Sequence, residues 1–148
     1  FFCIFNFPEF IIGKGIVTHE GSDVALLGVG TMLGEAFALR ELLERERVFA
    51  ETISLHTIKP LDECLLERLF RDFKRIVVIE EHGLIGGAGS AVLEWGNRHM
   101  VDTRKVIRFG GPDRFLTAVG SQAEARKSLG IDAVQMATTI LQDLQTIC

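Results

Sequence analysis

Apolar positions along the chain follow two different spacings from residue 23 onward. Short apolar runs without strict alternation predict strands that are covered on both faces, and they fall at 24–29, 52–58, 76–80 and 106–109. Between these runs, apolar residues recur every three or four positions, as on one side of a helix. Strands that alternate with helices of ten or more residues form βαβ units. We therefore expect an α/β protein, a three-layer α/β/α sandwich with a mostly parallel central sheet.

Helix-capping residues predict where these helices begin and end. Glu124 and Gln135 each stand three positions after a capping residue, which is the capping-box pattern, and Gly130 is suited to end a helix between them. Residues 9–22 could form a small hairpin around Gly13. The expected N-caps are Thr31, Asp62, Ser121 and Asp132. The last helix is expected to bury an apolar face made of Val134, Ala137, Ile140, Leu141 and Leu144.

Composition and charge agree with a globular protein and exclude several partners. The chain has 148 residues, 47% hydrophobic and 24% charged, with a net charge of −4. This charge gives no electrostatic reason to expect binding to nucleic acid or to an anionic membrane. Cys3, Cys64 and Cys148 are odd in number and far apart, which favours reduced thiols over disulfides or a zinc site. We expect a cytoplasmic protein.

A glycine-rich stretch, EEHGLIGGAGSAVLEW at 80–95, leads from the third predicted strand into a helix. Backbone amides at a helix N-terminus can hold a phosphate or carboxylate. The stretch lacks the Lys-Ser/Thr ending of a P-loop, however, and Glu80 and Glu81 would repel an anion. Close helix–strand packing together with a subunit contact is the interpretation that we favour over an anion site. The residues of this possible anion or interface loop are His82, Gly83, Gly86, Gly87, Gly89 and Ser90.

Other candidate residues do not assemble into a catalytic set. His82 follows a strand at its carboxyl end, the best position in this chain for a working histidine, although a hydrogen-bonded interface histidine is the simpler interpretation. Asp113 either caps a turn or approaches a site at the same edge. GVGTMLG at 28–34 has one residue too many for a dinucleotide fingerprint, and Glu51 precedes the second strand instead of ending it. No cluster has metal-ligand spacing.

Four stretches in order resemble one family. They are IGKGIVTHEGSDVALLGVGTM, SLHTIKPLD, IVVIEEHGLIGGAGSAV, and GGPDRF followed by GSQAEARKSLGID. Together they resemble the C-terminal domain of transketolase-like enzymes, a group that includes transketolase, 1-deoxyxylulose-5-phosphate synthase and the pyruvate dehydrogenase E1 β subunit. The resemblance covers about residues 11–145, and it implies the Rossmann-like fold of that domain. Gly111 departs from the family pattern, because an aliphatic residue usually stands before its Pro-Asp pair.

The resemblance implies a division of labour between domains. In this family, thiamine diphosphate and magnesium lie between a diphosphate-binding domain and a pyrimidine-binding domain, and the C-terminal domain extends the dimer interface. We expect no cofactor and no metal on this chain, and we assign it no catalytic residue. Residues 1–22 are expected to be a linker or hairpin from an upstream pyrimidine-binding domain, and 23–148 to be the C-terminal domain. The implied partners are the missing domains or subunits of the same enzyme and a second copy.

Three functions remain open from the sequence. The first is an assembly domain of an enzyme that transfers two-carbon ketol units between sugar phosphates, inactive by itself. The second is an independent module that binds a nucleotide or sugar phosphate through its glycine-rich loops. The third is the C-terminal domain of a 2-oxo acid dehydrogenase E1 β subunit, against which the wording EEHGLIGGAGS argues mildly. In the first case the glycine loop and Trp95 are expected near a subunit contact.

Overall fold

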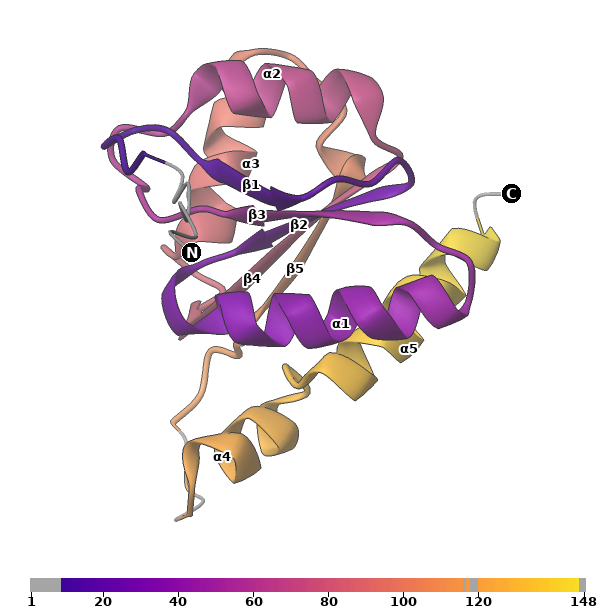
Figure 1. Ribbon diagram of the computed structural model, residues 1–148. Coiled ribbons are helices and arrows are strands. Elements are labelled where there is room, and N and C mark those ends of the chain that lie inside the picture. Colours follow the sequence, from indigo (N-terminus) through magenta and orange to yellow (C-terminus); the bar gives the residue numbers. More distant parts are fainter. Residues whose placement is uncertain (1–8, 116, 118–119, 147–148) are drawn as a thin grey trace, which may run out of the picture.

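The computed structural model describes residues 9–115, 117 and 120–146 (Figure 1). Within this range five strands form one sheet: β1 (Ile16–His19), β2 (Val24–Gly28), β3 (Ala50–Ser54), β4 (Arg75–Gly83) and β5 (Val106–Gly111). The α-helices are α1 (Leu33–Arg45), α2 (Glu63–Asp72), α3 (Ala88–Arg98), α4 (Gln122–Leu129) and α5 (Ala133–Thr146). Short 3-10 turns are η1 (Gly30–Met32) and η2 (Thr103–Lys105). None of these helices is long and apolar enough to cross a membrane.

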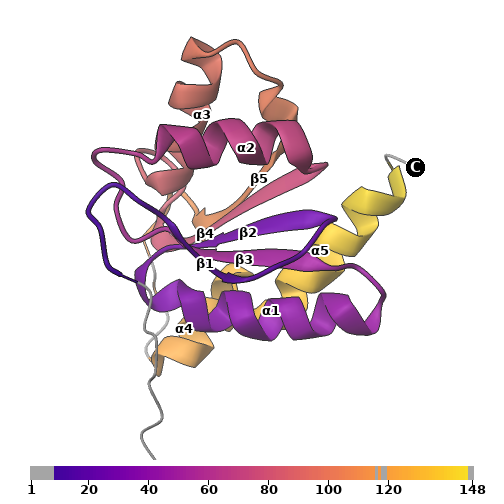
Figure 2. The ribbon, with the colours of Figure 1, turned by 45° about the horizontal axis from the view of Figure 1, so that its top comes forward.

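The sheet is mostly parallel and is covered on both faces. Its strand order is β1-β3-β2-β4-β5, in which only β1 runs antiparallel to its neighbour among the described strands. Helices α1 and α5 cover one face, and α2 and α3 cover the other (Figures 1 and 2). The three-layer α/β/α sandwich expected from the hydrophobic pattern is therefore confirmed. Helix α4 lies away from both layers, beyond one end of the sheet (Figure 1).

The central strand β2 explains why the apolar runs lack strict alternation. Successive side chains of a strand point to opposite faces. Val24 and Leu26 pack with α1 and α5, whereas Ala25 and Leu27 pack with α2 and α3. All four are fully buried, and burial of each larger side chain contributes about 1.5–3 kcal/mol. A strand buried on both sides must be apolar throughout, as this one is.

Two expectations about strands need correction. The strand expected at 52–58 instead begins at Ala50 and ends at Ser54, and the amide of Leu55 turns to the carbonyl of Gly28 (3.0 Å). His56 therefore follows the strand and is half-buried, not part of it. The hairpin expected at 9–22 is a turn at Gly13, with φ of +82°, followed by β1 on the edge of the sheet against β3. Residues 1–8 of the expected linker lie outside the described residues.

Most predicted helix caps are confirmed. Asp62 accepts a hydrogen bond from the amide of Leu65 (3.1 Å), and Ser121 forms a complete capping box with Glu124. Gly130 ends α4 with φ of +74°. The carboxylate of Asp132 accepts from the amides of Val134 and Gln135 in the first turn of α5. The described residues show no reciprocal bond from the Asp132 amide to the Gln135 side chain, which donates to the Asp132 carboxylate instead.

Two expectations about helix residues are wrong: Thr31 is not an N-cap, and Val134 does not lie on a buried helix face. Thr31 lies inside the η1 turn, and α1 begins after Met32 without a side-chain cap. The Thr31 hydroxyl donates instead to the Glu81 carboxylate (2.7 Å). Val134 is 64% exposed, because it lies beside the buried stripe of α5 and not on it. That stripe consists of Ala133, Met136, Ala137 and Ile140.

Candidate functional site

The topology places the candidate site between β2 and β4. These strands are parallel neighbours, yet β2 leads into α1 on one face while β4 leads into α3 on the other. Chain direction therefore diverges at their carboxyl ends, which opens the crevice where doubly wound sheets bind ligands. The glycine loop, His82 and the loop that follows β5 all lie at this edge. The crevice and the N-terminal amides of α3 beside it are therefore the positions where a ligand would be expected.

The N-terminus of α3 is occupied by a carboxylate of the protein itself. Glu80, which is 1% exposed, accepts hydrogen bonds from the amides of Ala88 (2.7 Å) and Gly89 (2.9 Å). A negative charge is favourable at this end of a helix because orphan N–H groups point toward it. An external phosphate would have to displace Glu80 from these two amides. The acid that we expected to repel an anion thus takes the anion's place.

Gly87 lets Glu80 reach these amides. A Cβ on Gly87 would lie 2.2 Å from Glu80 Oε2 and 2.6 Å from the carbonyl oxygen of Gly83, so any side chain there would force these groups to shift. Gly89 is equally confined, because its Cβ would meet the Arg108 side chain at 2.6 Å. These two glycines therefore serve close helix–strand packing, as we favoured from the sequence.

The outer part of the loop is turned toward solvent. Gly86 has φ of +77°, and its amide donates to the Ser90 hydroxyl oxygen (3.1 Å). The Ser90 hydroxyl donates in turn to the carbonyl of Leu84 (2.9 Å), which also accepts from Arg108 (2.9 Å). Ile85 at the tip is 72% exposed. Ser90 and Gly86 thus brace a loop that displays one apolar side chain.

The remaining predicted site residues do not converge. His82 is exposed, and its Nδ1 lies 3.1 Å from the carbonyl oxygen of Gly83. Gly83 pairs with Gly111 of β5, which brings the two loops side by side. Asp113 is exposed in the bend after β5. Trp95, expected near a contact surface, is only 1% exposed and packs in the core that α2 and α3 cover, so that expectation is wrong.

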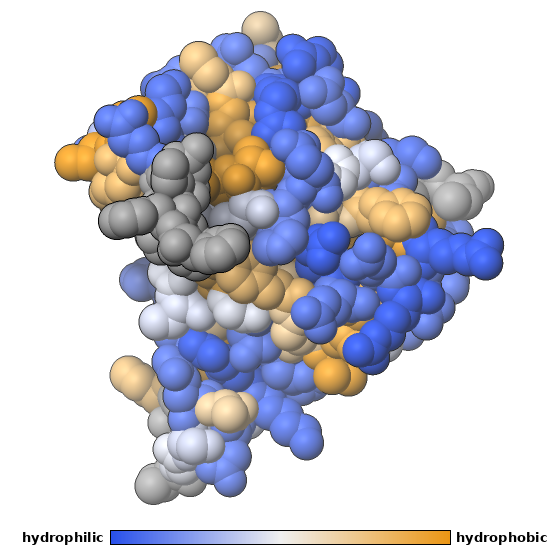
Figure 3. Space-filling view, in the orientation of Figure 1, coloured by the Kyte–Doolittle hydropathy of each residue, from blue (hydrophilic) through white to orange (hydrophobic). Residues whose placement is uncertain are grey.

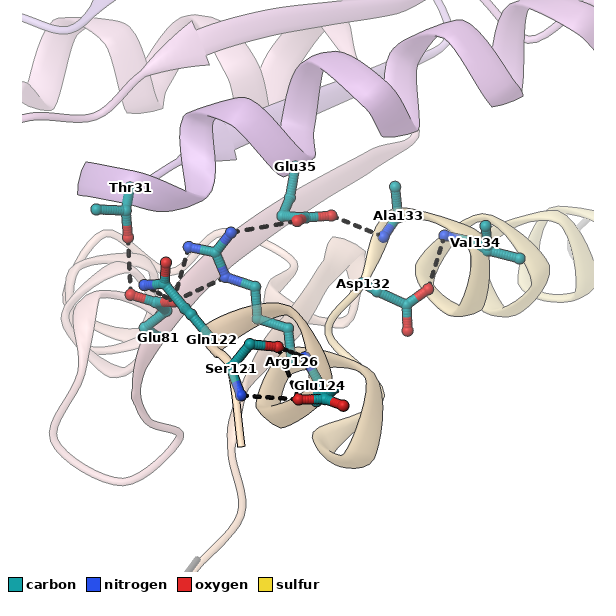
Figure 4. Close-up of polar contacts among 10 residues, drawn as sticks. All are labelled: Thr31, Glu35, Glu81, Ser121, Gln122, Glu124, Arg126, Asp132, Ala133 and Val134. Atoms are coloured by element: carbon teal, nitrogen blue, oxygen red, sulfur yellow. Dashed lines mark hydrogen bonds and ion pairs between the residues drawn. The ribbon is translucent and has the colours of Figure 1, made fainter. Parts of the chain in front are cut away.

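A polar cluster that the sequence did not reveal fills the crevice itself (Figure 4). Arg126 of α4 donates from Nε to Oε1 of Glu81 (2.8 Å), and its Nη1 donates to Oε1 of Glu35 on α1 (3.2 Å). Thr31 and Gln122 also donate to Glu81, at 2.7 and 2.8 Å. These residues come from η1, α1, β4 and α4 and are up to 95 positions apart in the chain.

This cluster keeps Glu81 ionised. Partial burial favours the neutral acid, but hydrogen bonds from Thr31, Arg126 and Gln122 outweigh it and hold the pKa of Glu81 below its ordinary value. The second carboxylate, Glu35, is held from its other side by the amide of Ala133 (3.0 Å) at the start of α5. The arrangement is a network of ion pairs and hydrogen bonds that joins η1, α1, β4, α4 and the start of α5.

The acid that a dinucleotide site would need is at the wrong end of the sheet. Glu51 lies near the start of β3, is 2% exposed, and forms a two-pronged ion pair with Arg68 of α2 at 3.1 and 2.6 Å. Ribose recognition requires an acid near the carboxyl end of that strand. Glu51 is therefore committed to packing α2 on the sheet.

The described residues do not fit magnesium-bound thiamine diphosphate. Among them, no group of three or more His, Cys, Asp or Glu side chains could hold a metal ion. The amides best placed for a diphosphate, those of Ala88 and Gly89, already bind Glu80. No step of a thiamine diphosphate reaction can be assigned to these residues.

These features define a doubly wound α/β domain whose ligand-binding edge is closed by its own side chains. Residues 13–136 match the family described as the C-terminal domain of transketolase, and the chain belongs to that family. A solved split-gene transketolase, described as an inactive β4 tetramer, superposes with a TM-score of 0.81 at 29% identity, covering 92% of this chain and 44% of that one.

Curated relatives are longer enzymes. The chain is 38% identical over 137 residues to 1-deoxy-D-xylulose-5-phosphate synthase of Cytophaga hutchinsonii, covering 90% of this chain and 21% of the relative. It is 41% identical over 136 residues to the synthase of Pectobacterium atrosepticum, covering 90% and 20%. The chain thus spans about a fifth of the length of the curated relatives it matches.

Proposed function

We propose that the chain is the C-terminal assembly domain of a transketolase-like enzyme of the 1-deoxy-D-xylulose-5-phosphate synthase type, and that it takes no direct part in catalysis. One observation carries this proposal: the carboxyl edge of the sheet is filled from within. Glu80 binds the amides of α3, and Arg126 lies in the crevice against Glu81. A domain closed in this way is suited to support its neighbours rather than to bind substrate.

In this proposal the reactive chemistry belongs to other domains of the parent enzyme. Thiamine diphosphate and magnesium would bind between the diphosphate-binding and pyrimidine-binding domains, and residues 1–22 would connect this chain to the latter. The parent's product would be the one named for the relatives, and two-carbon ketol transfer between sugar phosphates is the related alternative. The parent enzyme would be cytoplasmic.

Self-association is part of the same proposal. Ile85 at the tip of the glycine loop is 72% exposed, and Phe115 in the neighbouring loop is 95% exposed. The two loops are joined through the Leu84 amide and the Gly111 carbonyl (2.8 Å). Exposed apolar side chains on adjoining braced loops support a subunit contact with a second copy. The similar split-gene transketolase, which is described as an inactive β4 tetramer, is consistent with this interpretation.

Isothermal titration calorimetry tests the division of labour. The chain is titrated with thiamine diphosphate and magnesium, and then with a ketose phosphate, while a complete synthase serves as the positive control. We expect heat of binding from the complete enzyme only. Micromolar binding to the chain would refute the proposal. A thermal-shift screen with NAD, ATP and sugar phosphates covers the alternative of an independent module, because a ligand that binds the folded state stabilises it by an amount that grows with ligand concentration.

A further inference from the structure

The guanidinium of Arg126 occupies the crevice as a ligand would. Its Nε and Nη2 lie 2.8 and 2.7 Å from Oε1 of Glu81, its Nη1 lies 3.2 Å from Oε1 of Glu35, and its side chain is only 14% exposed. Figure 4 shows the guanidinium between the two carboxylates, reached by a long side chain that rises from α4. The planar fork of a guanidinium matches carboxylates better than any other cation in proteins.

The two carboxylates are held in place by groups other than Arg126. The Thr31 hydroxyl donates to Oε2 of Glu81 (2.7 Å), and the amide of Ala133 donates to Oε2 of Glu35 (3.0 Å). Neither donor belongs to α4, since Thr31 lies in the η1 turn that follows β2 and Ala133 is buried at the start of α5. The acceptors for a guanidinium therefore remain oriented if α4 moves.

Apart from Arg126, helix α4 is held by few contacts: Gln122 donates to Glu81 (2.8 Å), and the Gln135 side chain donates to the carbonyl of Lys127 (2.7 Å). None of its eight residues is buried, and its surface, at the bottom of Figure 3, is mainly hydrophilic. A hollow of about 510 Å³ lies beside it, where tight apolar packing would otherwise fix a helix. The hollow is lined by Glu35, Ala123, Lys127, Asp132, Val134 and Gln135. The C-terminal end of α4 is anchored by Leu129, the last residue of the helix, and by Ile131 just after it, both of which pack with the core.

We propose that the crevice between β2 and β4 is a guanidinium-binding site, which Arg126 fills in cis, and that α4 is a strap able to lift and leave this site to a guanidinium from outside the chain. An arginine side chain of another polypeptide and a small guanidino compound share this chemistry. In this proposal, an arginine of the chain itself occupies the usual ligand position of the fold and holds α4 closed. The proposal goes beyond the assembly role proposed above and does not depend on it.

Hydrogen exchange on the full chain with Arg126→Ala tests the strap. We expect the amides of 122–129 to exchange at least about fivefold faster than in the unmodified chain, with the sheet unchanged. Arg75→Ala is the matched control, because Arg75 is 13% exposed and forms a similar fork with Asp143 at the other end of the sheet. The control should leave the exchange of α4 unchanged. Unchanged exchange of α4 in Arg126→Ala would overturn the strap.

Ligand binding to Arg126→Ala, whose crevice lacks its own guanidinium, tests the ligand chemistry. Isothermal titration should show methylguanidinium binding to this variant, with methylammonium binding at least about tenfold more weakly because it lacks the planar fork. Adding Glu81→Gln should abolish the binding of methylguanidinium. Equal binding of methylammonium, or binding that survives Glu81→Gln, would refute a guanidinium site. N-acetylarginine amide compared with methylguanidinium distinguishes the sources, because tighter binding of the peptide-like probe indicates a polypeptide arginine.

Arg126→Lys keeps the experiment decisive if the alanine variant does not fold. This variant retains the positive charge but lacks the planar fork. We expect its α4 to exchange at a rate between those of the unmodified and alanine chains. Exchange identical to that of the unmodified chain would show that charge alone holds α4, and the proposed guanidinium specificity would be wrong.

Discussion

The buried carboxylate of Glu80 accepts a 2.7 Å hydrogen bond from the backbone amide of Ala88, so that an acid of β4 caps the N-terminus of α3. This bond reaches across eight residues of glycine-rich chain. It fixes the direction in which α3 leaves the sheet, and it removes the free amides on which an anion site would depend.

Glu80→Ala should therefore destabilise the domain. Two buried amides would lose their acceptor, which lowers the free energy of unfolding by about 2–4 kcal/mol. Urea unfolding followed by circular dichroism measures the change. Glu94→Ala, on the exposed side of the same helix, is the control and should shift the free energy of unfolding by less than about 0.5 kcal/mol. Equal effects of the two changes would contradict the capping role.

Gly87→Ala should be destabilising for a steric reason. The new Cβ would lie 2.2 Å from Glu80 Oε2, so the carboxylate or the helix must shift, and we expect a loss of about 1–3 kcal/mol in the free energy of unfolding. Gly34→Ala is the matched control, since its Cβ meets nothing within 4 Å inside α1. The control should be neutral or stabilising by up to about 1 kcal/mol. A tolerated Gly87→Ala would show that the loop can relax.

Acid should loosen α4. The pKa of Glu81 is lower in the folded chain than in the unfolded one, so its contribution to stability is complete above the unfolded value and disappears as pH falls through the folded value. The charged groups around it are Arg126, in direct contact, and Glu35 beyond that guanidinium. Exchange of α4, corrected for its intrinsic pH dependence, should stay constant from neutral pH to about pH 5 and rise below about pH 4.

Glu124 supplies a second acid-sensitive contact in the same helix. Hydrogen bonds from the amide and the hydroxyl of Ser121 hold the pKa of Glu124 below its ordinary value. Glu124→Gln separates the two contributions, because Glu81 alone then remains to titrate. An acid response that is unchanged in Glu81→Gln but absent in Glu124→Gln would assign the effect to the capping box instead.

Ile85→Lys should weaken self-association. If the glycine loop contacts a second copy, a charge at its exposed tip raises the dissociation constant at least about tenfold. Light scattering over a range of concentrations measures this change, with Met100→Lys as the control because Met100 is 92% exposed but lies after α3, away from the loop. A chain that remains monomeric without any substitution would refute the subunit contact itself.

The fold could be predicted from the sequence because the spacing of apolar residues depends on which faces of each strand and helix are buried. VALLG of β2 is apolar throughout because both of its faces are covered, and Asp62 stands where the first turn of α2 needs an acceptor. One error arose where a side chain has a tertiary partner. Thr31 resembles a helix cap, but its hydroxyl is used by Glu81, fifty positions later. Spacing alone cannot reveal such a partner.

The candidate site was predictable only in part, for the same reason. Confinement of Gly87 and Gly89 followed from their place between strand and helix. That Glu80 would turn inward to their amides did not follow, because an acid at a strand's end can also point to solvent. Arg126 offered no local hint, since a charged residue on a polar helix is ordinarily solvated. Its burial arises only when α4 folds back over the edge of the sheet.

The internal cap of α3 changes how a run of glycines after a strand should be interpreted. Such a run is commonly taken as room left for a nucleotide, but here the same room admits an acidic side chain from the strand itself. Whether such a motif binds a ligand or only joins a strand to a helix therefore depends on a residue outside the glycine run. In this chain that residue is Glu80, seven positions before Gly87.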